Sequence, residues 1–156
     1  SELFDRVLNN TQFRLQFINR YADLVNTLFQ TQAFNADIDA FIDALDAGMG
    51  PHIQRWNSPA TTSVWLNAIN NLTSHNSTRI GTARDHLMNS FGLPDSHECT
   101  LDAFPPLAGH VRVNTIEPGP LPWDGIYFEE CPIEIEAIAA TGYLFDKWDL
   151  NAHIES

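Results

Sequence analysis

The chain has 156 residues, a formal net charge of −12 and 44% hydrophobic residues, which suits one globular domain or two small ones. The acidic charge excludes nucleic acid as a partner, because binding to phosphates requires a basic face. No apolar run approaches the ~20 residues that cross a bilayer, so we expect no membrane span.

The negative charge is concentrated in the second part of the sequence. Residues 1–92 contain eight acidic residues and six arginines, a net charge of −2. Residues 93–156 contain twelve acidic residues against Arg112 and Lys147, a net charge of −10. This asymmetry predicts two units with different surfaces.

Two amphipathic helices are predicted in the first fifty residues. The first follows Thr11, a suitable N-cap. Its apolar stripe consists of Phe13, Phe17, Tyr21, Leu24 and Leu28. The second helix begins near Asn35 and ends at Gly48, a typical C-terminal stop. Residues 50–56 then add a short helical piece.

Two further helices are predicted before residue 93. Ser58 as N-cap and Pro59 in the first turn predict a helix over residues 58–72. The next helix covers residues 76–91 and ends at Gly92. The proline-rich, polar stretch of residues 94–107 is then predicted to be a linker.

After the predicted linker the apolar period falls to two residues. Alternating segments at 110–116, 131–139 and 141–148, with a short strand at 125–128, predict a small antiparallel β module. The fold class expected for the whole chain is therefore α+β. Because a sheet of two or three strands is only marginally stable alone, we expect that one or more strands were either cut off or come from a neighbouring molecule.

Several segments of residues 1–93 carry the signature of a known family. "FRLQFINRYADLVNTLF", "PHIQRW" and "HLMNSFGL" resemble the C-terminal end of the CotH kinase family, spore-coat CotH-like proteins with an atypical kinase-like fold. The resemblance implies that the first helix packs against an upstream kinase-like lobe. It also implies that ATP and a divalent metal ion bind upstream, so no catalytic, cofactor or metal residue is assigned here.

Residues 108–149 resemble the small β-repeat module that often follows such domains in secreted and cell-surface bacterial proteins. The matching features are Gly109, Asn114, "WDGIYF", "IEIEAIA" and "GYLFDKW". Together the two resemblances imply a C-terminal fragment of a bacterial, secreted or cell-surface protein. Its parts would be a helical portion of a CotH-like domain (1–93), a linker (94–107) and a partial β-repeat module (108–156).

The function implied is structural and non-catalytic: the chain would complete the kinase-like lobe and carry the β module. One alternative is a stand-alone module that binds carbohydrate or a cell-surface protein. Another is part of an active protein kinase whose catalytic residues lie upstream. Nucleotide binding by this chain alone would support an enzyme.

The residues themselves offer no site for phosphoryl transfer, which needs a phosphate cradle, a cation and carboxylates for Mg²⁺. The sequence contains neither a P-loop nor a glycine-rich kinase loop. Lys147, the only lysine, is expected on the surface. The His-Glu-Cys run at 97–99 is too closely spaced for a structural zinc site. The alternating glutamates at 134 and 136 are more typical of a solvated strand face than of a calcium site.

Three sets of residues have open interpretations. Arg20 and Asp23 form either a local pair on one helix or an attachment of that helix to the upstream lobe. Cys99 and Cys131, the only cysteines, would form a disulfide in an exported protein and remain thiols in a reducing compartment. The aromatic residues of the β module either form its core or bind glycan; the candidates for binding are Trp123, Tyr127 and Trp148.

Overall fold

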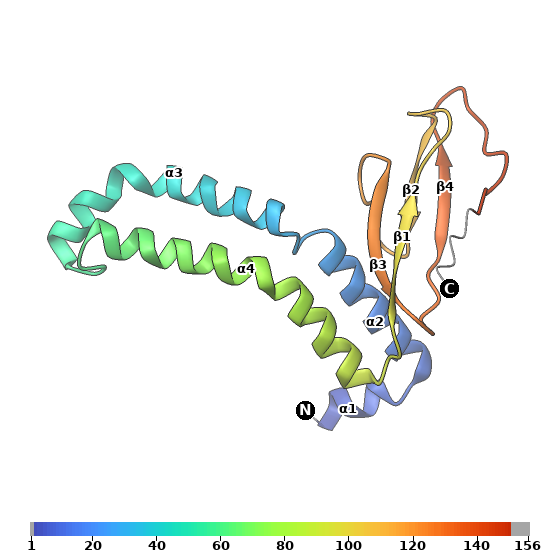
Figure 1. The fold of residues 1–156 in the computed structure, drawn as a ribbon, viewed down its shortest axis with the longest axis horizontal. Helices are drawn as coiled ribbons and strands as arrows, with labels where there is room; N and C mark the ends of the chain where they lie inside the picture. The colour runs from blue at the N-terminus through green and yellow to red at the C-terminus, as the bar shows by residue number, and fades with distance from the viewer. Residues whose placement is uncertain (1, 151–156) are drawn as a thin grey trace.

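The computed structural model describes residues 2–150, with the backbone alone at residue 77. In that part of the chain four helices come first: α1 (Glu2–Leu8), α2 (Thr11–Asn26), α3 (Thr31–Trp56) and α4 (Thr62–Phe91). Four strands follow: β1 (Ser96–Leu101), β2 (Gly109–Val113), β3 (Trp123–Phe128) and β4 (Ile135–Ala139). The predicted α+β class is confirmed (Figure 1). None of the described helices is long and apolar enough to cross a membrane.

The helix α2 begins one residue earlier than predicted, because Thr11 is its first residue and not its N-cap. Its buried face also differs from the predicted stripe. Asn10 is the N-cap, and its side chain accepts a hydrogen bond of 3.0 Å from the N–H of Phe13. The core residues of α2 are Ile18, Ala22 and Val25, whereas Leu28 is 66% exposed. The buried face is therefore rotated away from the predicted stripe, because the β strands, rather than other helices, cover it.

The helix α3 is one continuous helix where the sequence predicts two pieces. It runs for 26 residues, through Gly48 and Pro51, and ends at Asn57 in the left-handed conformation (φ 48°). Glycine and proline disfavour the interior of a helix. Here α3 lies along α4 for most of its length (Figure 1), and packing between the two helices overrides that local preference.

The helix α4 likewise joins two predicted helices into one of 30 residues. The predicted start at Ser58 and Pro59 is wrong, since both residues lie in the turn between α3 and α4. Thr61 is the N-cap, and its hydroxyl accepts from the N–H of Val64 at 3.2 Å. The predicted stop at Gly92 is confirmed, with φ 64° at that residue.

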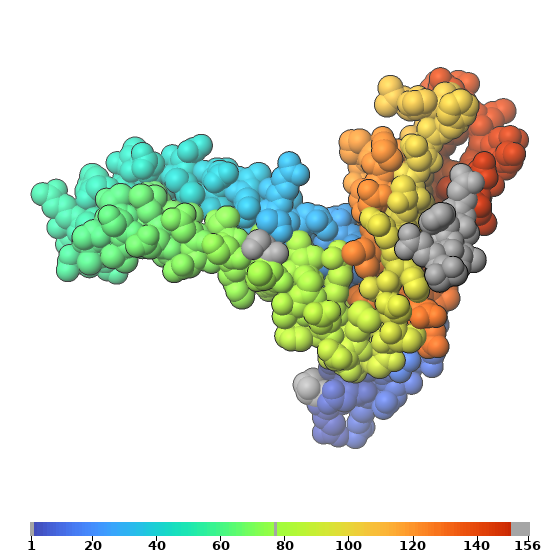
Figure 2. Space-filling view, viewed as in Figure 1, coloured from blue at the N-terminus to red at the C-terminus, as the bar shows by residue number. Residues whose placement is uncertain are grey.

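Together α3 and α4 form an antiparallel hairpin that projects from the rest of the molecule (Figures 1 and 2). The residues that face the partner helix are at least half-buried: Phe34, Ile38, Ile42, Met49 and Ile53 on α3, and Trp65, Ile69, Thr73, Ile80 and Leu87 on α4. Only Ile38 and Leu87 of these are fully buried. This hairpin, called the helical arm below, is therefore thin, and much of its apolar surface faces solvent.

The strands form two antiparallel pairs, β1 with β3 and β2 with β4; the strands and their connections are called the β unit below. The strand β1 lies inside the predicted linker, so that prediction is wrong for residues 96–101. The predicted strand at 141–148 is not formed; a turn at Gly142 (φ 92°) precedes irregular chain to residue 150. A further strand, β1, thus comes from this chain itself, and the β unit also packs on α2.

The main core lies between α2 and the β unit. Its buried members are Ile18, Ala22, Leu87, Leu101, Val111, Val113, Tyr127, Phe128 and Cys131. These residues come from α2, α4, the strands β1, β2 and β3, and the β3–β4 connection, which contains Cys131. The helix α2, which resembles part of a larger lobe, thus has a packing partner within this chain.

Candidate functional site at the junction of α2 and the β unit

The polar residues of α2 lie on the face that contacts the β unit. Asn19, Arg20, Asp23 and Asn26 are spaced so that they share one side of a helix. Asn19 donates from Nδ2 to the carbonyl oxygen of Pro132 at 2.7 Å. Arg20 donates from Nη1 to the hydroxyl of Thr115, also at 2.7 Å. The sequence-distant β unit is therefore attached to α2 by directed polar contacts as well as by the core.

Asp23 is the centre of this junction, with 0% of its surface exposed. Its Oδ1 accepts from Asn114 Nδ2 and from the phenol of Tyr127, both at 3.0 Å. Its Oδ2 accepts from the hydroxyl of Thr115 at 3.0 Å. Burying a carboxylate without partners is strongly unfavourable. These donors, together with the backbone N–H of Thr115 at 3.5 Å, compensate that desolvation. They belong to three residues of the β2–β3 segment, so Asp23 stabilises one arrangement of helix and strands.

The phenol of Tyr127 is held in its protonated form. Burial raises the pKa of Tyr127 above its ordinary value, and the neighbouring charge of Asp23 adds to the effect. A protonated phenol is the form that can donate to the carboxylate. The hydrogen bond between these two side chains therefore persists across the neutral pH range.

Asn26 makes a second polar contact, directly with the backbone of β3. Its Nδ2 donates to the carbonyl oxygen of Ile126 at 2.8 Å, and its Oδ1 accepts from the N–H of the same residue at 3.1 Å. The side-chain amide thus occupies the hydrogen-bonding positions that a neighbouring strand would fill. Because β3 has β1 on its other edge, α2 covers the edge that would otherwise be open.

Arg84 brings α4 into the same junction. It donates from Nη2 to Oδ1 of Asn26 at 2.9 Å, so that oxygen accepts from two donors. Burial lowers the pKa of Arg84, which nevertheless stays a cation at neutral pH. The contact links α2, α4 and β3 through one amide.

The structure decides between the two interpretations of Arg20 and Asp23. The two side chains are bridged by the hydroxyl of Thr115, which accepts from Arg20 and donates to Asp23. Both side chains attach α2 to the β unit. Within residues 2–150 they do not pair directly with each other, and their hydrogen bonds are made with the β unit of this chain. Asn26 was visible in the sequence only as a polar residue three positions after Asp23 and was given no role, and Arg84 was not singled out.

The two cysteines are free thiols that line one groove of about 360 Å³ on the β unit. Cys131 is buried and Cys99 is half-buried. Burial raises the pKa of both thiols. The thiolate is the reactive form, so neither residue has the environment of a nucleophile. The disulfide between them stays a prediction.

The candidate binding aromatics occupy different environments. Tyr127 is a core residue whose hydroxyl is used by Asp23. Trp123 is half-buried and covers Gly125, where its ring leaves no room for a Cβ atom. Trp148 lies outside the strands, is 43% exposed and packs on Phe145 with ring centroids 5.2 Å apart. Of the three candidates, Trp148 is the one that offers a largely accessible ring.

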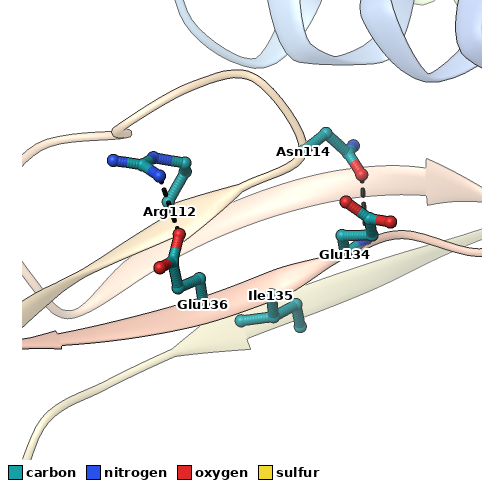
Figure 3. A pocket seen from close by; sticks show the side chains of 5 residues that line it. All are labelled: Arg112, Asn114, Glu134, Ile135 and Glu136. Carbon is teal, nitrogen blue, oxygen red and sulfur yellow. Dashed lines mark hydrogen bonds and ion pairs between the residues drawn. The ribbon is translucent and has the colours of Figure 1, made fainter.

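A second groove, of about 430 Å³, lies on the outer surface of β2 and β4 (Figure 3). Two of its charged residues pair with each other, since Arg112 contacts Glu136 at 2.7 Å; Arg112 also contacts Glu117 at 3.2 Å. The Oδ1 of Asn114 accepts from the N–H of Glu134 at 2.9 Å. Among residues 2–150 no three His, Cys, Asp or Glu side chains are grouped so that they could hold a metal ion.

Comparison with known proteins identifies the helical part of the chain. Searches of curated proteins and of solved structures found no match. A family model described as CotH kinase protein matches residues 1–82, a stretch that contains α1, α2, α3 and two thirds of α4 and is more than half of the sequence. The chain therefore belongs to the CotH kinase protein family.

Proposed function

We propose that the chain is a non-catalytic, structural part of a secreted or cell-surface CotH protein of a bacterium. Its helices complete a kinase-like lobe, and its β unit is an accessory module of the β-repeat type. The family match over residues 1–82 supports the first part of this proposal. The resemblance of residues 108–149 to modules of exported bacterial proteins supports the second.

The observation that carries the proposal is the position of Asp23. This residue lies inside the segment that the family model matches, and all three residues that donate hydrogen bonds to it lie in the β unit. The family segment and the β unit are therefore joined into one structural unit. A lobe that binds the helices would carry the β unit at a set position and orientation.

Exposed apolar residues lie at both ends of α2. Leu3 of α1, before α2, is 75% exposed, and Leu28 and Phe29, after α2, are 66% and 49% exposed. Adjacent large apolar side chains on a surface, such as Leu28 and Phe29, indicate an interface. These residues all lie in the family segment, where contact with a kinase-like lobe is expected.

The proposal that this chain is non-catalytic is supported by the hydrogen bonds that the buried carboxylate of Asp23 accepts. Phosphoryl transfer requires carboxylates that can coordinate Mg²⁺. Both oxygens of Asp23 already accept hydrogen bonds, so this carboxylate is not available to a metal ion. ATP and the divalent metal ion would therefore be bound by other parts of the kinase-like protein.

The test compares the chain alone with the chain joined to the coding sequence that precedes it in its gene. We expect no ATP binding and no autophosphorylation by the chain alone. In the joined protein we expect slower amide hydrogen exchange at α1 and at residues 27–30. Nucleotide binding by residues 1–156 alone would contradict the non-catalytic role, and unchanged exchange at both segments would contradict completion of the lobe.

A stand-alone binding module is the second candidate, favoured by the accessible pair of Phe145 and Trp148. Aromatic rings of this kind stack on sugar rings or on partner side chains. A glycan array probed with the wild type and with Trp148→Ala would test it, with Trp56→Ala as a control for loss of an exposed tryptophan on the helical arm. Binding that is lost only in Trp148→Ala supports this candidate, and no binding by the wild type excludes it.

A further inference from the structure

The helical arm has one apolar side. Phe41 and Leu45 of α3 are 69% and 52% exposed, and Val64 and Leu72 of α4 are 49% and 47% exposed. Within each helix they share one side, because their spacings are four and eight residues. These four residues are called the arm face below. Isolated exposed apolar residues are ordinary, but a contiguous group indicates an interface.

The two helices present this face in the same direction. Phe41 comes directly before the inward-facing Ile42, and Leu72 directly before the inward-facing Thr73. One residue rotates a side chain by about 100° around a helix, in the same sense on each helix. In two antiparallel helices that pack on each other, a residue one position before an inward-facing residue points to the same side of the hairpin on both helices. Phe41 and Leu72 therefore point to the same side.

Charges of opposite sign stand at the two ends of the arm face. Asp37 and Arg55 are 18 residues apart, which is five whole turns at 3.6 residues per turn, so they lie on the stripe that contains Phe41. Asp37 is near the base of the arm and Arg55 near its tip (Figure 1). Within residues 2–150 neither side chain forms an ion pair, although Arg55 lies over the ring of Trp56 at 5.0 Å.

We propose that the arm face binds the arm face of a second copy of this chain, with the tip of one arm over the base of the other. A two-fold axis through the middle of the arm produces this arrangement. It places Asp37 of each copy over Arg55 of the other, so the dimer contains two such ion pairs. It also places Phe41 at the level of Pro51 of the other copy, and Leu72 close to Leu72 of the other copy.

The size of the arm face suits a dimer of modest affinity. The distance from Asp37 to Arg55 is about 27 Å at 1.5 Å per residue, and two helices side by side are about 20 Å wide. Each copy would thus cover roughly 500 Å², and the pair roughly 1,000 Å², which is near the lower limit for a specific interface. A dissociation constant in the range of about 1–50 μM is therefore expected.

The first test is sedimentation of the whole chain at concentrations from about 1 to about 200 μM, which bracket that range. We expect Leu72→Gln to weaken the dimer about tenfold or more, since both copies lose an apolar contact near the axis. Leu66→Gln is the matched control: Leu66 is 45% exposed but lies about 120° away around α4. A monomer at all concentrations, or equal effects of the two substitutions, would overturn the proposal.

The second test addresses the charges. Asp37→Arg alone and Arg55→Asp alone should each be largely monomeric, because each places like charges opposite one another. An equimolar mixture of the two variants should form a heterodimer, since every Arg then faces an Asp. Asp39→Arg, on the opposite side of α3, should leave the wild-type dimer unchanged. Rescue of Asp37→Arg by Arg79→Asp instead of Arg55→Asp would overturn the tip-to-base arrangement. Circular dichroism checks that each variant keeps its helices.

Discussion

The carboxylate of Asp23 on α2 and the phenol of Tyr127 on β3 are 104 residues apart in sequence and are joined by a buried hydrogen bond of 3.0 Å. Neither end of this contact is open to solvent, as Asp23 is 0% and Tyr127 is 5% exposed. The pair lies where the segment typical of CotH kinase proteins meets the β unit. Besides the apolar core, the attachment of α2 to the β unit therefore rests on a few buried polar groups that solvent does not reach.

Asp23→Asn should destabilise the protein by about 2–4 kcal/mol, because an amide presents a donor to a site that consists of donors. Urea unfolding followed by circular dichroism measures the change. The exposed Asp39 on α3 serves as the control, and Asp39→Asn should change the free energy of unfolding by less than about 0.5 kcal/mol. Equal effects of the two substitutions would show that the Asp23 network does not stabilise the junction.

The stability should decrease in alkaline solution because of Tyr127. Its pKa is raised in the folded protein, so the unfolded chain loses the phenolic proton first. The contribution of the raised pKa is fully present below the unfolded pKa of about 10 and is lost as the pH rises above it. The expected slope is at most about 1.4 kcal/mol per pH unit.

The substitution Tyr127→Phe measures how much Tyr127 contributes to the slope of the free energy of unfolding against pH. The thiols of Cys99 and Cys131 also have raised pKa values, and they contribute equally to both proteins, so the difference between wild type and variant reports on Tyr127. Tyr143→Phe, a change at an exposed ring, should keep the wild-type slope. A wild type and a Tyr127→Phe variant with parallel curves between pH 9 and about pH 11 would refute this assignment.

The two thiols should react slowly with a maleimide under native conditions. Burial raises both pKa values, so little thiolate is present at neutral pH. Cys131, which is 5% exposed, should react more slowly than the half-buried Cys99, and both should react at once in denaturant. Peptide mapping of the protein recovered from its native compartment without reductant would show whether the predicted disulfide forms there.

The sequence was sufficient for the fold class and for the presence of helices, since the apolar spacing is local information. The boundaries failed where contacts between distant residues override local preference. Pro51 is a breaking signal and Ser58–Pro59 a start signal, yet α3 continues through Pro51, and Ser58 and Pro59 lie in the turn before α4. The reason in both cases is that the two helices of the arm pack along most of their length.

The strand β1 and the polar junction could not be read from sequence for the same reason. The residues of β1 become a strand by pairing with β3, whose first residue is more than twenty positions later, and the flanking prolines suggest a linker. A buried aspartate in an amphipathic helix resembles a solvated one until its partners are known. Asp23 was a candidate only because Arg20 lies close to it, whereas its true partners are in the β unit.

Asn26→Ala should loosen the β unit locally as well as globally. The substitution removes the amide that pairs with both backbone groups of Ile126 and leaves the half-buried Arg84 without its acceptor. Buried polar groups without partners cost about 1–3 kcal/mol each, so a loss of about 2–4 kcal/mol is expected. Asn70→Ala, at an exposed position of α4, is the control and should be nearly neutral.

Hydrogen exchange distinguishes the local effect from a general loss of stability. The amide of Ile126 donates to Asn26 and to no strand neighbour, so its exchange should accelerate by more than the change in global stability accounts for. The amide of Tyr127, which lies in the β1–β3 ladder, should follow global stability alone. If both amides accelerate by the same factor, the side chain of Asn26 does not protect the edge of β3, and α2 and β3 are held together by the apolar core instead.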